Sequence, residues 1–416
     1  MTTKTDNIAN CILFINHLFE IETKVRKNEI FYILFEHGCS SFVFYDMRII
    51  ISFIIFAILI AWEAYVVVRS EQTFFRSAKS KMVFRTVIIL LILSVILGTI
   101  SDNHLPIAIA KPIRFASFSL LIFMLYYFPF VVITDIVRAI NKRHPFLQNP
   151  QKFRFRVGVV GIIAVTSIMI VGNYRFNHPT KVYLDIESTK SKQGKELKIV
   201  ALSDVHLGIS LGEKAAKKYV NMINAEKPDL VLFVGDLIDH SVPVVVQQNL
   251  DRQLRQISAP LGVYGVLGNH EYFAGAGDDL FDFYRKSGIV ILRDTSVLIN
   301  DEVYLVGRDD AFNQHRKTLR QLMQSTDSSK PSILLDHQPN HLRDAEENNI
   351  DLQLSGHTHD GQVYPGNLIA AAMFELSHGY KIKGNTHYYV SSGLGIWGPL
   401  YRIGTQSELM VIRFRY

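Results

Sequence analysis

Cysteine is nearly absent from this sequence of 416 residues, which has only Cys11 and Cys39, both near the amino terminus. A disulfide framework and a thiolate metal site are therefore excluded for the rest of the chain. The sequence also lacks a Walker-type phosphate loop, which argues against a P-loop nucleotide-binding protein. Internal repeats and low-complexity segments are missing as well, which argues against a repeat protein.

Charge of either sign is unevenly distributed along the chain, which has a formal net charge of +6. Residues 1–175 carry 19 Lys and Arg against 10 Asp and Glu, whereas residues 176–416 carry 25 against 28. The basic excess therefore belongs to the apolar amino-terminal part. No basic stretch with interleaved aromatic residues accompanies the polar motifs described below, so no nucleic-acid partner is expected.

Long apolar runs are abundant between residues 47 and 175. Four of them have the length that a helix needs to cross about 30 Å of hydrocarbon, namely 49–68, 83–100, 115–133 and 157–174. Lys and Arg are concentrated in the first and third connecting loops, so the positive-inside rule predicts that these loops face the cytoplasm. We therefore predict a multi-pass protein of the cell membrane whose part after residue 175 is extracytoplasmic.

Residues 1–46 leave two interpretations open. They lack the basic start and the small-residue cleavage site of a signal peptide. They could form an amphipathic helix at the membrane surface. Alternatively, translation could start at Met47, which directly precedes the first long apolar run. We assign this tail no function.

The chain after residue 176 alternates between strand-like and helix-like segments. Short apolar runs are typical of buried strands and occur at 197–202, 230–234, 262–267, 332–335 and 350–354. Apolar residues recur at helical spacing over 213–226, 244–257 and 278–286. Such alternation predicts a layered α/β domain over residues 176–416.

A polar motif follows each of these five apolar runs. The motifs are Asp204-Val205-His206, Gly235-Asp236-Leu237-Ile238-Asp239, Gly268-Asn269-His270-Glu271, His337 and Gly356-His357-Thr358-His359. Side chains at the carboxyl ends of strands converge on one crevice in α/β folds, so we expect a single site. Carboxylate and amide oxygens mixed with imidazoles suit Mn, Fe or Zn better than calcium. Each motif alone could be surface or core residues, but five in succession favour a metal site.

This order of motifs resembles the calcineurin-like metallophosphoesterase family, and within it the membrane-attached bacterial branch. The resemblance covers residues 198–416 and implies an α/β/β/α sandwich of two stacked sheets, here preceded by a four-helix transmembrane region. It implies one metal held by Asp204, His206 and His359, and a second held by Asn269, His337 and His357. It also implies that Asp236 bridges the two metals. His270 is expected to assist leaving-group departure, and Asp239 to orient His270.

The resemblance further implies a phosphoesterase with two divalent or trivalent transition-metal ions, which hydrolyses phosphoester or pyrophosphate bonds through a metal-activated hydroxide. We predict a phosphodiesterase that acts on an envelope or lipid-linked substrate and contacts membrane lipids. Two alternatives stay open. One is a phosphomonoesterase for small soluble phosphates, and the other is a non-enzymatic interaction module on the same fold.

An apolar segment, residues 368–374, follows the last motif and must lie beside the site. It could pack under the sheet as an ordinary short helix. Alternatively, it could form an exposed lip that touches the membrane, because exposed apolar patches mark interaction sites. Met373 and Phe374 would then be the anchors, and Trp397 would add a second wall.

Overall fold

The computed structural model describes residues 41–100, 105–190 and 194–416, with side chains for 57–93, 105–190 and 194–416. Both cysteines and residues 1–40 of the tail 1–46 lie outside this part of the chain, and residues 41–46 are helical. The chain divides into two compact units, Met1–Tyr65 and Val66–Tyr416. The second unit contains both β-sheets and all five polar motifs.

In the described part of the chain, four long helices precede the sheets: α3 (Ser41–Phe74), α4 (Ala78–Ile100), α5 (Ile107–Arg143) and α6 (Pro150–Asn177). Within the described residues, α5 and α6 are long and apolar enough to cross a membrane. They contain the predicted spans 115–133 and 157–174. The predicted spans 49–68 and 83–100 lie in α3 and α4, partly outside the residues described with side chains. The structure therefore supports two of the four predicted spans.

Helix α5 is longer than the apolar run that predicted it. It begins at Ile107, so Lys111 and Arg114, which fall in the second predicted loop between the spans 83–100 and 115–133, lie on the helix instead. Charged side chains end an apolar run, but they leave the backbone hydrogen bonds of a helix intact. Hydropathy therefore located the span and missed the start of the helix.

The first sheet has the strand order β1, β12, β2, β3, β4, β5. Its strands are β1 (Thr180–Glu187), β12 (Glu408–Arg415), β2 (Glu196–Leu202), β3 (Leu230–Val234), β4 (Val263–Val266) and β5 (Val290–Ile291). β12 is antiparallel to β2 and parallel to β1. β2, β3, β4 and β5 are parallel, so the chain returns between them through helices.

The second sheet has the strand order β10, β11, β9, β8, β7, β6. Its strands are β10 (Gly379–Lys383), β11 (Thr386–Val390), β9 (Leu352–Ser355), β8 (Ser332–Leu335), β7 (Val303–Gly307) and β6 (Thr295–Ile299). The central strands β11, β9, β8 and β7 are parallel, and the edge strands β10 and β6 are antiparallel to their neighbours. Both sheets are therefore mixed.

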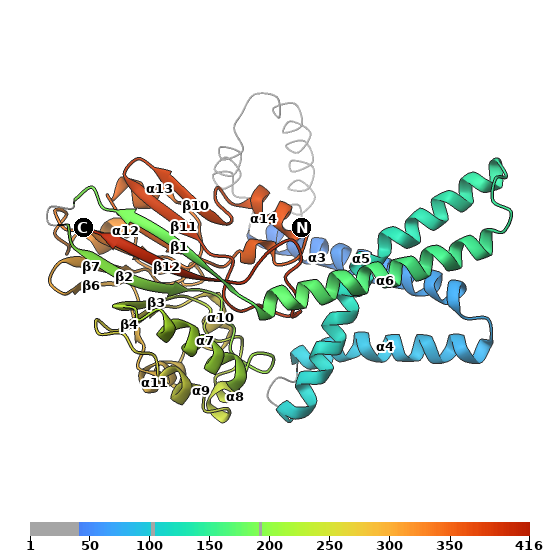
Figure 1. Ribbon diagram of the computed structural model, residues 1–416, viewed down its shortest axis with the longest axis horizontal. Helices are drawn as coiled ribbons and strands as arrows, with labels where there is room; N and C mark the ends of the chain where they lie inside the picture. The colour runs from blue at the N-terminus through green and yellow to red at the C-terminus, as the bar shows by residue number, and fades with distance from the viewer. Residues whose placement is uncertain (1–40, 101–104, 191–193) are drawn as a thin grey trace, which may run out of the picture. The chain divides into compact units, whose positions relative to one another are not determined.

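The two sheets stack face to face, with helices on both outer surfaces (Figure 1). Side chains alternate along β2: Ile199 and Ala201 join a core that also contains Ile333 and Leu354 of the second sheet. Val200, which lies between these two residues in the strand, packs against helices on the other face of the sheet. These helices are α7 (Glu213–Ala225), α8 (Val242–Gln247), α9 (Leu250–Leu254) and α11 (Asp278–Ser287). The predicted two-sheet α/β domain is confirmed.

Shorter helices complete the domain. α12 (Leu319–Met323) and α13 (Arg343–Glu347) pack on the outer face of the second sheet. The remaining helical segments are α10 (Asn269–Phe273), η1 (His359–Gly361) and α14 (Gly366–Met373). The predicted helix 244–257 is wrong in one respect. It is split into α8 and α9 at Asn249, whose φ of 53° is left-handed and ends the first helix.

Candidate metal centre

The carboxyl ends of parallel strands bring the five predicted motifs together. β2, β3 and β4 run parallel in one sheet, and β8 and β9 run parallel in the other. Backbone hydrogen bonds connect the loops that follow them: Asp204 N–H donates to Gly235 O (3.1 Å), and Gly356 N–H donates to His337 O (2.9 Å). The N–H of His357 donates to the Asp204 carboxylate at 3.1 Å, which links the loops of the two sheets.

Asp204, His206 and His359 form the first group of possible metal ligands. Nε2 of His206 lies 3.1 Å from Nε2 of His359 and 4.0 Å from Oδ1 of Asp204. Nε2 of His359 lies 3.4 Å from the same carboxylate oxygen. Atoms that bind one ion at about 2 Å are ~3–4 Å from one another. The three donor atoms are therefore spaced to hold a single ion.

Asp236, His337 and His357 form the second group. Nε2 of His337 lies 3.1 Å from Oδ2 of Asp236. The same oxygen lies 3.8 Å from Nε2 of His206, so Asp236 faces both groups. Oδ1 of Asn269 lies 2.8 Å from Nδ1 of His357, which places the amide in the second group. The structure thus brings together all seven residues that the sequence suggested as ligands.

The hydrogen bonding of the imidazoles fits a metal site. Nδ1 of His337 lies 2.7 Å from the carbonyl oxygen of Val234 and donates to it, so Nε2 is left with the lone pair. That buried Nε2 makes no hydrogen bond with the described residues, nor does buried Nδ1 of His206 or His359. Buried polar atoms normally have partners, and unpaired ones are costly. A bound cation would use the lone pair that His337 presents.

Burial also sets the protonation of these histidines. Loss of hydration lowers the pKa of His206 to about 3 and lowers the pKa of His359 well below its ordinary value. Burial lowers the pKa of His357 as well. Neutral imidazole is the form that binds metals. Burial likewise acts to lower the pKa of His337, but the negative charge of Asp236 outweighs it and raises that pKa. A cation that binds His337 would displace this proton from Nε2.

His270 is held by Asp239. Its Nδ1 donates to the backbone oxygen of Asp239 at 2.8 Å and lies 3.4 Å from Oδ1. Burial lowers the pKa of His270, but the hydrogen bond to Asp239 and the charge of Asp236 raise it to about 9. The ring is then protonated at neutral pH, as a proton donor must be. His206, Asp239 and His270 are also close enough to share an ion, but the donated hydrogen bond keeps Nδ1 of His270 from being a ligand.

The backbone at the site is strained. The φ angles of Asp204, His206, Asp236, His357 and His359 are positive, between 50° and 69°. Residues other than glycine rarely adopt this left-handed conformation, which costs of order 1 kcal/mol or more at each position. Such residues cluster where the surrounding structure imposes them for function.

Glu271 connects two of the site loops and received no role from the sequence. It is fully buried, and its carboxylate accepts hydrogen bonds from the backbone N–H groups of Asp236 (3.0 Å) and Gly268 (2.7 Å). A third comes from the Tyr284 hydroxyl at 2.9 Å. The loops are so close that a Cβ on Gly268 would lie 2.1 Å from Oδ1 of Asp236. The only sequence signal for Glu271 was an acidic residue next to His270.

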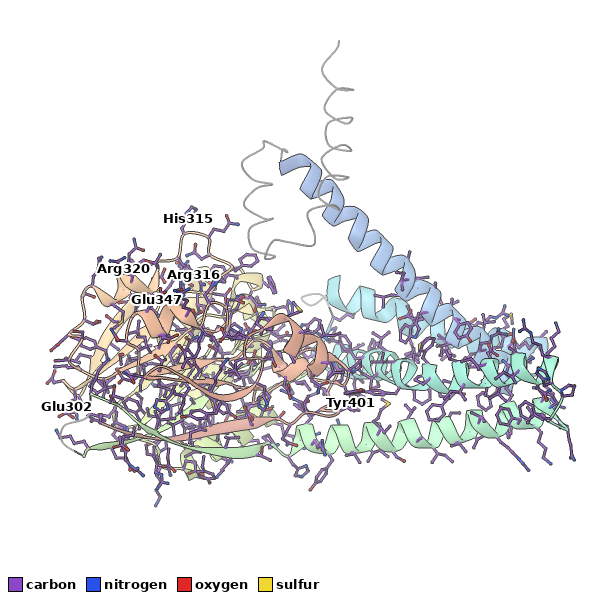
Figure 2. All side chains as sticks on the ribbon, turned by 90° about the horizontal axis from the view of Figure 1, so that it is seen from above. Glu302, His315, Arg316, Arg320, Glu347 and Tyr401 are labelled. Atoms are coloured by element: carbon purple, nitrogen blue, oxygen red, sulfur yellow. The ribbon has the colours of Figure 1, made fainter. Side chains whose placement is uncertain are left out.

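Residues 398–402, which follow Trp397, form a loop beside the site that sequence analysis also left without a role. The fully buried Arg402 donates from Nη1 to the backbone oxygen of His359 at 2.7 Å. Tyr401, labelled in Figure 2, contacts α5: its hydroxyl lies 2.7 Å from Oγ of Ser119, and its ring centroid lies 6.3 Å from that of Phe115. This loop therefore connects the metal centre to α5. No spacing or pattern in the sequence indicated this contact.

Partly exposed aromatic side chains lie beside the metal centre. Trp397 and Phe273 lie beside His270, with ring centroids 6.3 Å and 5.3 Å away, and both are about half exposed. On the other side, the Phe374 ring lies 6.2 Å from the His357 ring. We call the set of Phe273, Trp397 and Phe374 the aromatic rim.

The segment predicted either to pack under the sheet or to form a lip is exposed. Residues 366–373 form helix α14, in which Ala370 alone is buried. Leu368, Ile369 and Met373 are 56%, 60% and 71% exposed. The packed alternative is therefore wrong, and an apolar surface lies next to the metal-binding turn.

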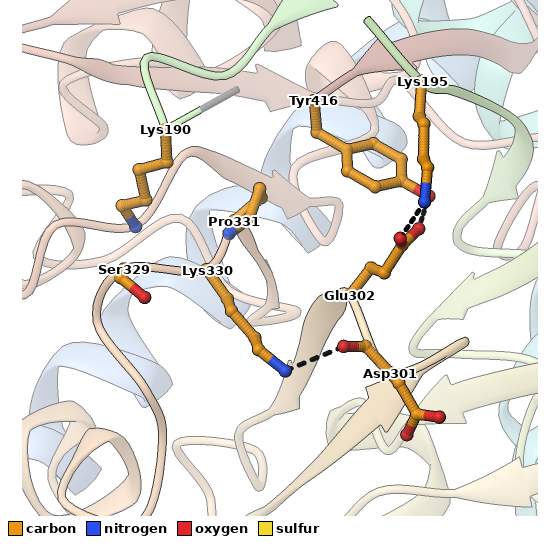
Figure 3. A pocket seen from close by; sticks show the side chains of 8 residues that line it. All are labelled: Lys190, Lys195, Asp301, Glu302, Ser329, Lys330, Pro331 and Tyr416. Carbon is orange, nitrogen blue, oxygen red and sulfur yellow. Dashed lines mark hydrogen bonds and ion pairs between the residues drawn. The ribbon is translucent and has the colours of Figure 1, made fainter. Parts of the chain in front are cut away.

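A separate cavity of about 280 Å³ lies at the opposite strand ends (Figure 3). It is lined by residues before β2 and β8 and by the carboxyl terminus, whereas the site motifs follow these strands. Its lysines are engaged: Lys190 pairs with Asp351 (2.8 Å), Lys195 pairs with Glu302, and Lys330 donates to Asp301 O (2.7 Å). Two of these lysines are thus paired with carboxylates, and the third is held by a backbone oxygen.

Comparisons with known proteins agree with this geometry. A sequence model of the family described as calcineurin-like phosphoesterase matches residues 197–361. A metallophosphoesterase of Helicobacter pylori is 32% identical over 320 residues, which cover 76% of this chain and 83% of the relative. A transmembrane protein with a metallophosphoesterase domain from Danio rerio is 28% identical over 306 residues, which cover 69% of each chain.

The matched segment 197–361 begins in β2 and ends just after His359, so it spans all five motifs and both groups of possible ligands. The similarity to the Helicobacter relative extends over most of both chains. The chain therefore belongs to the calcineurin-like metallophosphoesterase family and is a metal-dependent phosphoester hydrolase.

Proposed function

We propose that the protein is a membrane-anchored phosphodiesterase that uses two transition-metal ions to hydrolyse an envelope or lipid-linked phosphoester. The observation that carries this proposal is the position of Asp236. Its Oδ2 lies 3.8 Å from Nε2 of His206 in one ligand group and 3.1 Å from Nε2 of His337 in the other. A carboxylate shared by two groups is the arrangement that a two-metal hydrolytic site requires.

The assignment of ligands follows the two groups. One ion would be held by Asp204, His206 and His359, the other by Asn269, His337 and His357, and Asp236 would contact both. The mixture of carboxylate, amide and imidazole donors suits Mn, Zn or Fe. When bound, the ions supply Lewis acidity that polarises the phosphoryl group and activates the attacking water.

The chain itself contributes a proton at the leaving group. Nδ1 of His270 is engaged by the backbone oxygen of Asp239, so Nε2 is the nitrogen that can give a proton to the departing oxygen. The Asp239 carboxylate, 3.4 Å from Nδ1, stabilises the charged ring before transfer and keeps its orientation. This division of roles needs no covalent intermediate on the protein.

The exposed apolar surface supports a lipid-linked substrate. Met373 on α14 and Phe374 follow the metal-binding turn directly, and Phe374 lies beside His357. We expect the wild-type protein to hydrolyse a micellar lipid phosphodiester and bis-para-nitrophenyl phosphate faster than the corresponding monoester. The double variant Met373→Ser/Phe374→Ser should lose activity on the micellar substrate, because it removes the apolar contact. It should keep its activity on the soluble diester.

The double variant Leu368→Ser/Ile369→Ser provides a control on the same helix, since these residues are 56% and 60% exposed and lie five residues earlier. Equal losses on both substrates, with a lower melting temperature, would show that residues 373–374 stabilise the fold and do not bind lipid. Faster hydrolysis of the monoester would favour the phosphomonoesterase alternative.

For the chain as a whole, we propose a membrane region at residues 47–175 and an extracytoplasmic catalytic domain at residues 176–416. Contacts between helices support this topology. Arg154 of α6 donates to Oγ1 of Thr73 of α3 at 2.7 Å, which brings the first and third loops to one end of the helices. At the other end, Asn173 of α6 donates to Leu400 O at 2.9 Å in the catalytic domain. The two basic loops are thus opposite the catalytic domain.

A reporter enzyme fused after Tyr416 tests the topology. We expect signal from a reporter that is active only outside the cytoplasm, because Lys and Arg in the first and third loops retain those loops inside. A fusion truncated between α5 and α6, within residues 144–149, should give the opposite result. Signal only from a cytoplasm-dependent reporter after Tyr416 would overturn the topology.

A further inference from the structure

Helix α5 reaches the residue that holds the proposed proton donor. Arg114 of α5 and Asp239 are both buried, with 8% and 9% of their side chains exposed, and Nη2 lies 3.6 Å from Oδ2. The other carboxylate oxygen, Oδ1, lies 2.8 Å from Nδ1 of His240 and 3.4 Å from Nδ1 of His270. Asp239 is therefore fixed by the helix on one side and contacts His270 on the other.

The rest of α5 packs against the same region of the catalytic domain. Ala110, one turn before Arg114, packs with Ile209 after β2 and with Val244 of α8, and these residues flank the Asp239 loop. Further along, Ser119 contacts Tyr401, and the Tyr126 hydroxyl donates to Tyr364 O at 2.5 Å. The helix thus follows the edge of the metal centre over several turns. These contacts hold α5 against the catalytic domain, and they hold Arg114 in place with it.

An anchor helix does not need a buried arginine. Charged residues within apolar helices are costly and are retained mainly where they pair or function. Lys111, three residues earlier on the same helix, is exposed. A positive charge on this helix therefore does not require a buried position. A buried pair contributes little net stability, but loss of one partner leaves a charge uncompensated. The pair between Arg114 and Asp239 therefore has a direct effect on the placement of the Asp239 carboxylate.

We propose that Arg114 is a positioning residue for phosphoester hydrolysis, which holds Asp239 in the orientation that aligns His270 with the leaving group. The active site then consists of the catalytic domain and one residue from an apolar helix outside the matched family segment. This inference rests on the role proposed for His270. It extends that role, because the apolar helix becomes part of the catalytic machinery as well as an anchor.

The test uses the full-length protein with its metals restored. We expect Arg114→Met to reduce kcat roughly 10- to 100-fold, the usual effect of losing a group that orients a site residue, with metal content and KM nearly unchanged. The loss should grow as the leaving-group phenol becomes less acidic, because poor leaving groups depend most on His270. Arg114→Lys should restore part of the rate. Lys111→Met, which removes the same charge from the exposed face of α5, should leave kcat unchanged.

Two further variants separate this inference from the proposed function. In a His270→Ala background, Arg114→Met should cause no additional loss, since the residue acts through His270. In metal-free protein, Arg114→Met should lower the melting temperature less in an Asp239→Asn background than in the wild type. The positioning role would be wrong if the effect of Arg114→Met were the same in both variant backgrounds as in the wild type. It would also be wrong if the loss of rate were the same for all leaving groups. If His270→Ala itself had no effect on poor leaving groups, the proposed function would fail first.

Discussion

Asp236→Asn is expected to remove most of the bound metal and to reduce kcat by roughly 10³-fold, equivalent to about 4 kcal/mol of barrier. Asp236 is nearly inaccessible to solvent, and its Oδ2 faces a histidine from each ligand group. The amide has the same shape but no negative charge, so it would not compensate the positive charge of two cations held by the two groups. Metal analysis of the purified full-length protein after reconstitution with Mn or Zn measures the effect directly.

Asp351→Asn is the control for this substitution. Asp351 is equally buried, but it binds Ser188, Lys190 and Ser332 at the opposite strand ends. Its replacement should leave the metal content close to two ions per chain. If Asp236→Asn kept two ions, or if the wild type bound fewer than one, the two-metal proposal would be wrong.

His270→Ala is expected to keep both metals and to slow turnover by roughly 10²- to 10⁴-fold, the usual contribution of a positioned proton donor. The proposed metal ligands do not include His270, and its Nδ1 donates to the backbone oxygen of Asp239, so both groups of proposed ligands should still bind metal without its ring. The loss should be largest for diesters of weakly acidic alcohols. Steady-state kinetics over a series of leaving groups, together with metal analysis, tests both parts.

The series of leaving groups also provides the internal control. A leaving group such as para-nitrophenol needs little protonation, so its diester should be the least affected by His270→Ala. A wild-type rate with a poor leaving group would show that another residue donates the proton. Loss of metal would show that His270 belongs to the ligand set, for example through the group that it forms with His206 and Asp239.

The sequence located the proposed ligands because they are at strand ends. Each motif follows an apolar run, and parallel strands place their carboxyl ends together whatever the intervening loops do. The same local logic gave helices α7 and α11 almost residue by residue, since each has an apolar face and a clear end. It failed where a single residue broke the pattern, as left-handed Asn249 divides α8 from α9.

Local sequence patterns could not predict contacts between segments that are far apart in the chain. Glu271 was visible as an acidic residue, but only the fold brings the backbone N–H of Asp236, 35 residues earlier, to its carboxylate. Arg114 was counted as a loop charge, because hydropathy measures composition and does not report which side of a helix meets another domain. The sequence also left undecided whether α14 is exposed, because an apolar run of that length can be core or surface.

The sequence by itself determined the layered α/β class and the residues grouped at the metal centre, because residue type and the apolar pattern of a segment are local properties. The resemblance of its motifs implied the family and the two stacked sheets. The tertiary structure alone decided that Asp236 lies between the two ligand groups, that residues 368–373 are exposed, and that α5 supplies Arg114 to Asp239. These depend on how separate elements pack, and packing is determined by the shape and burial of the whole unit rather than by any one segment.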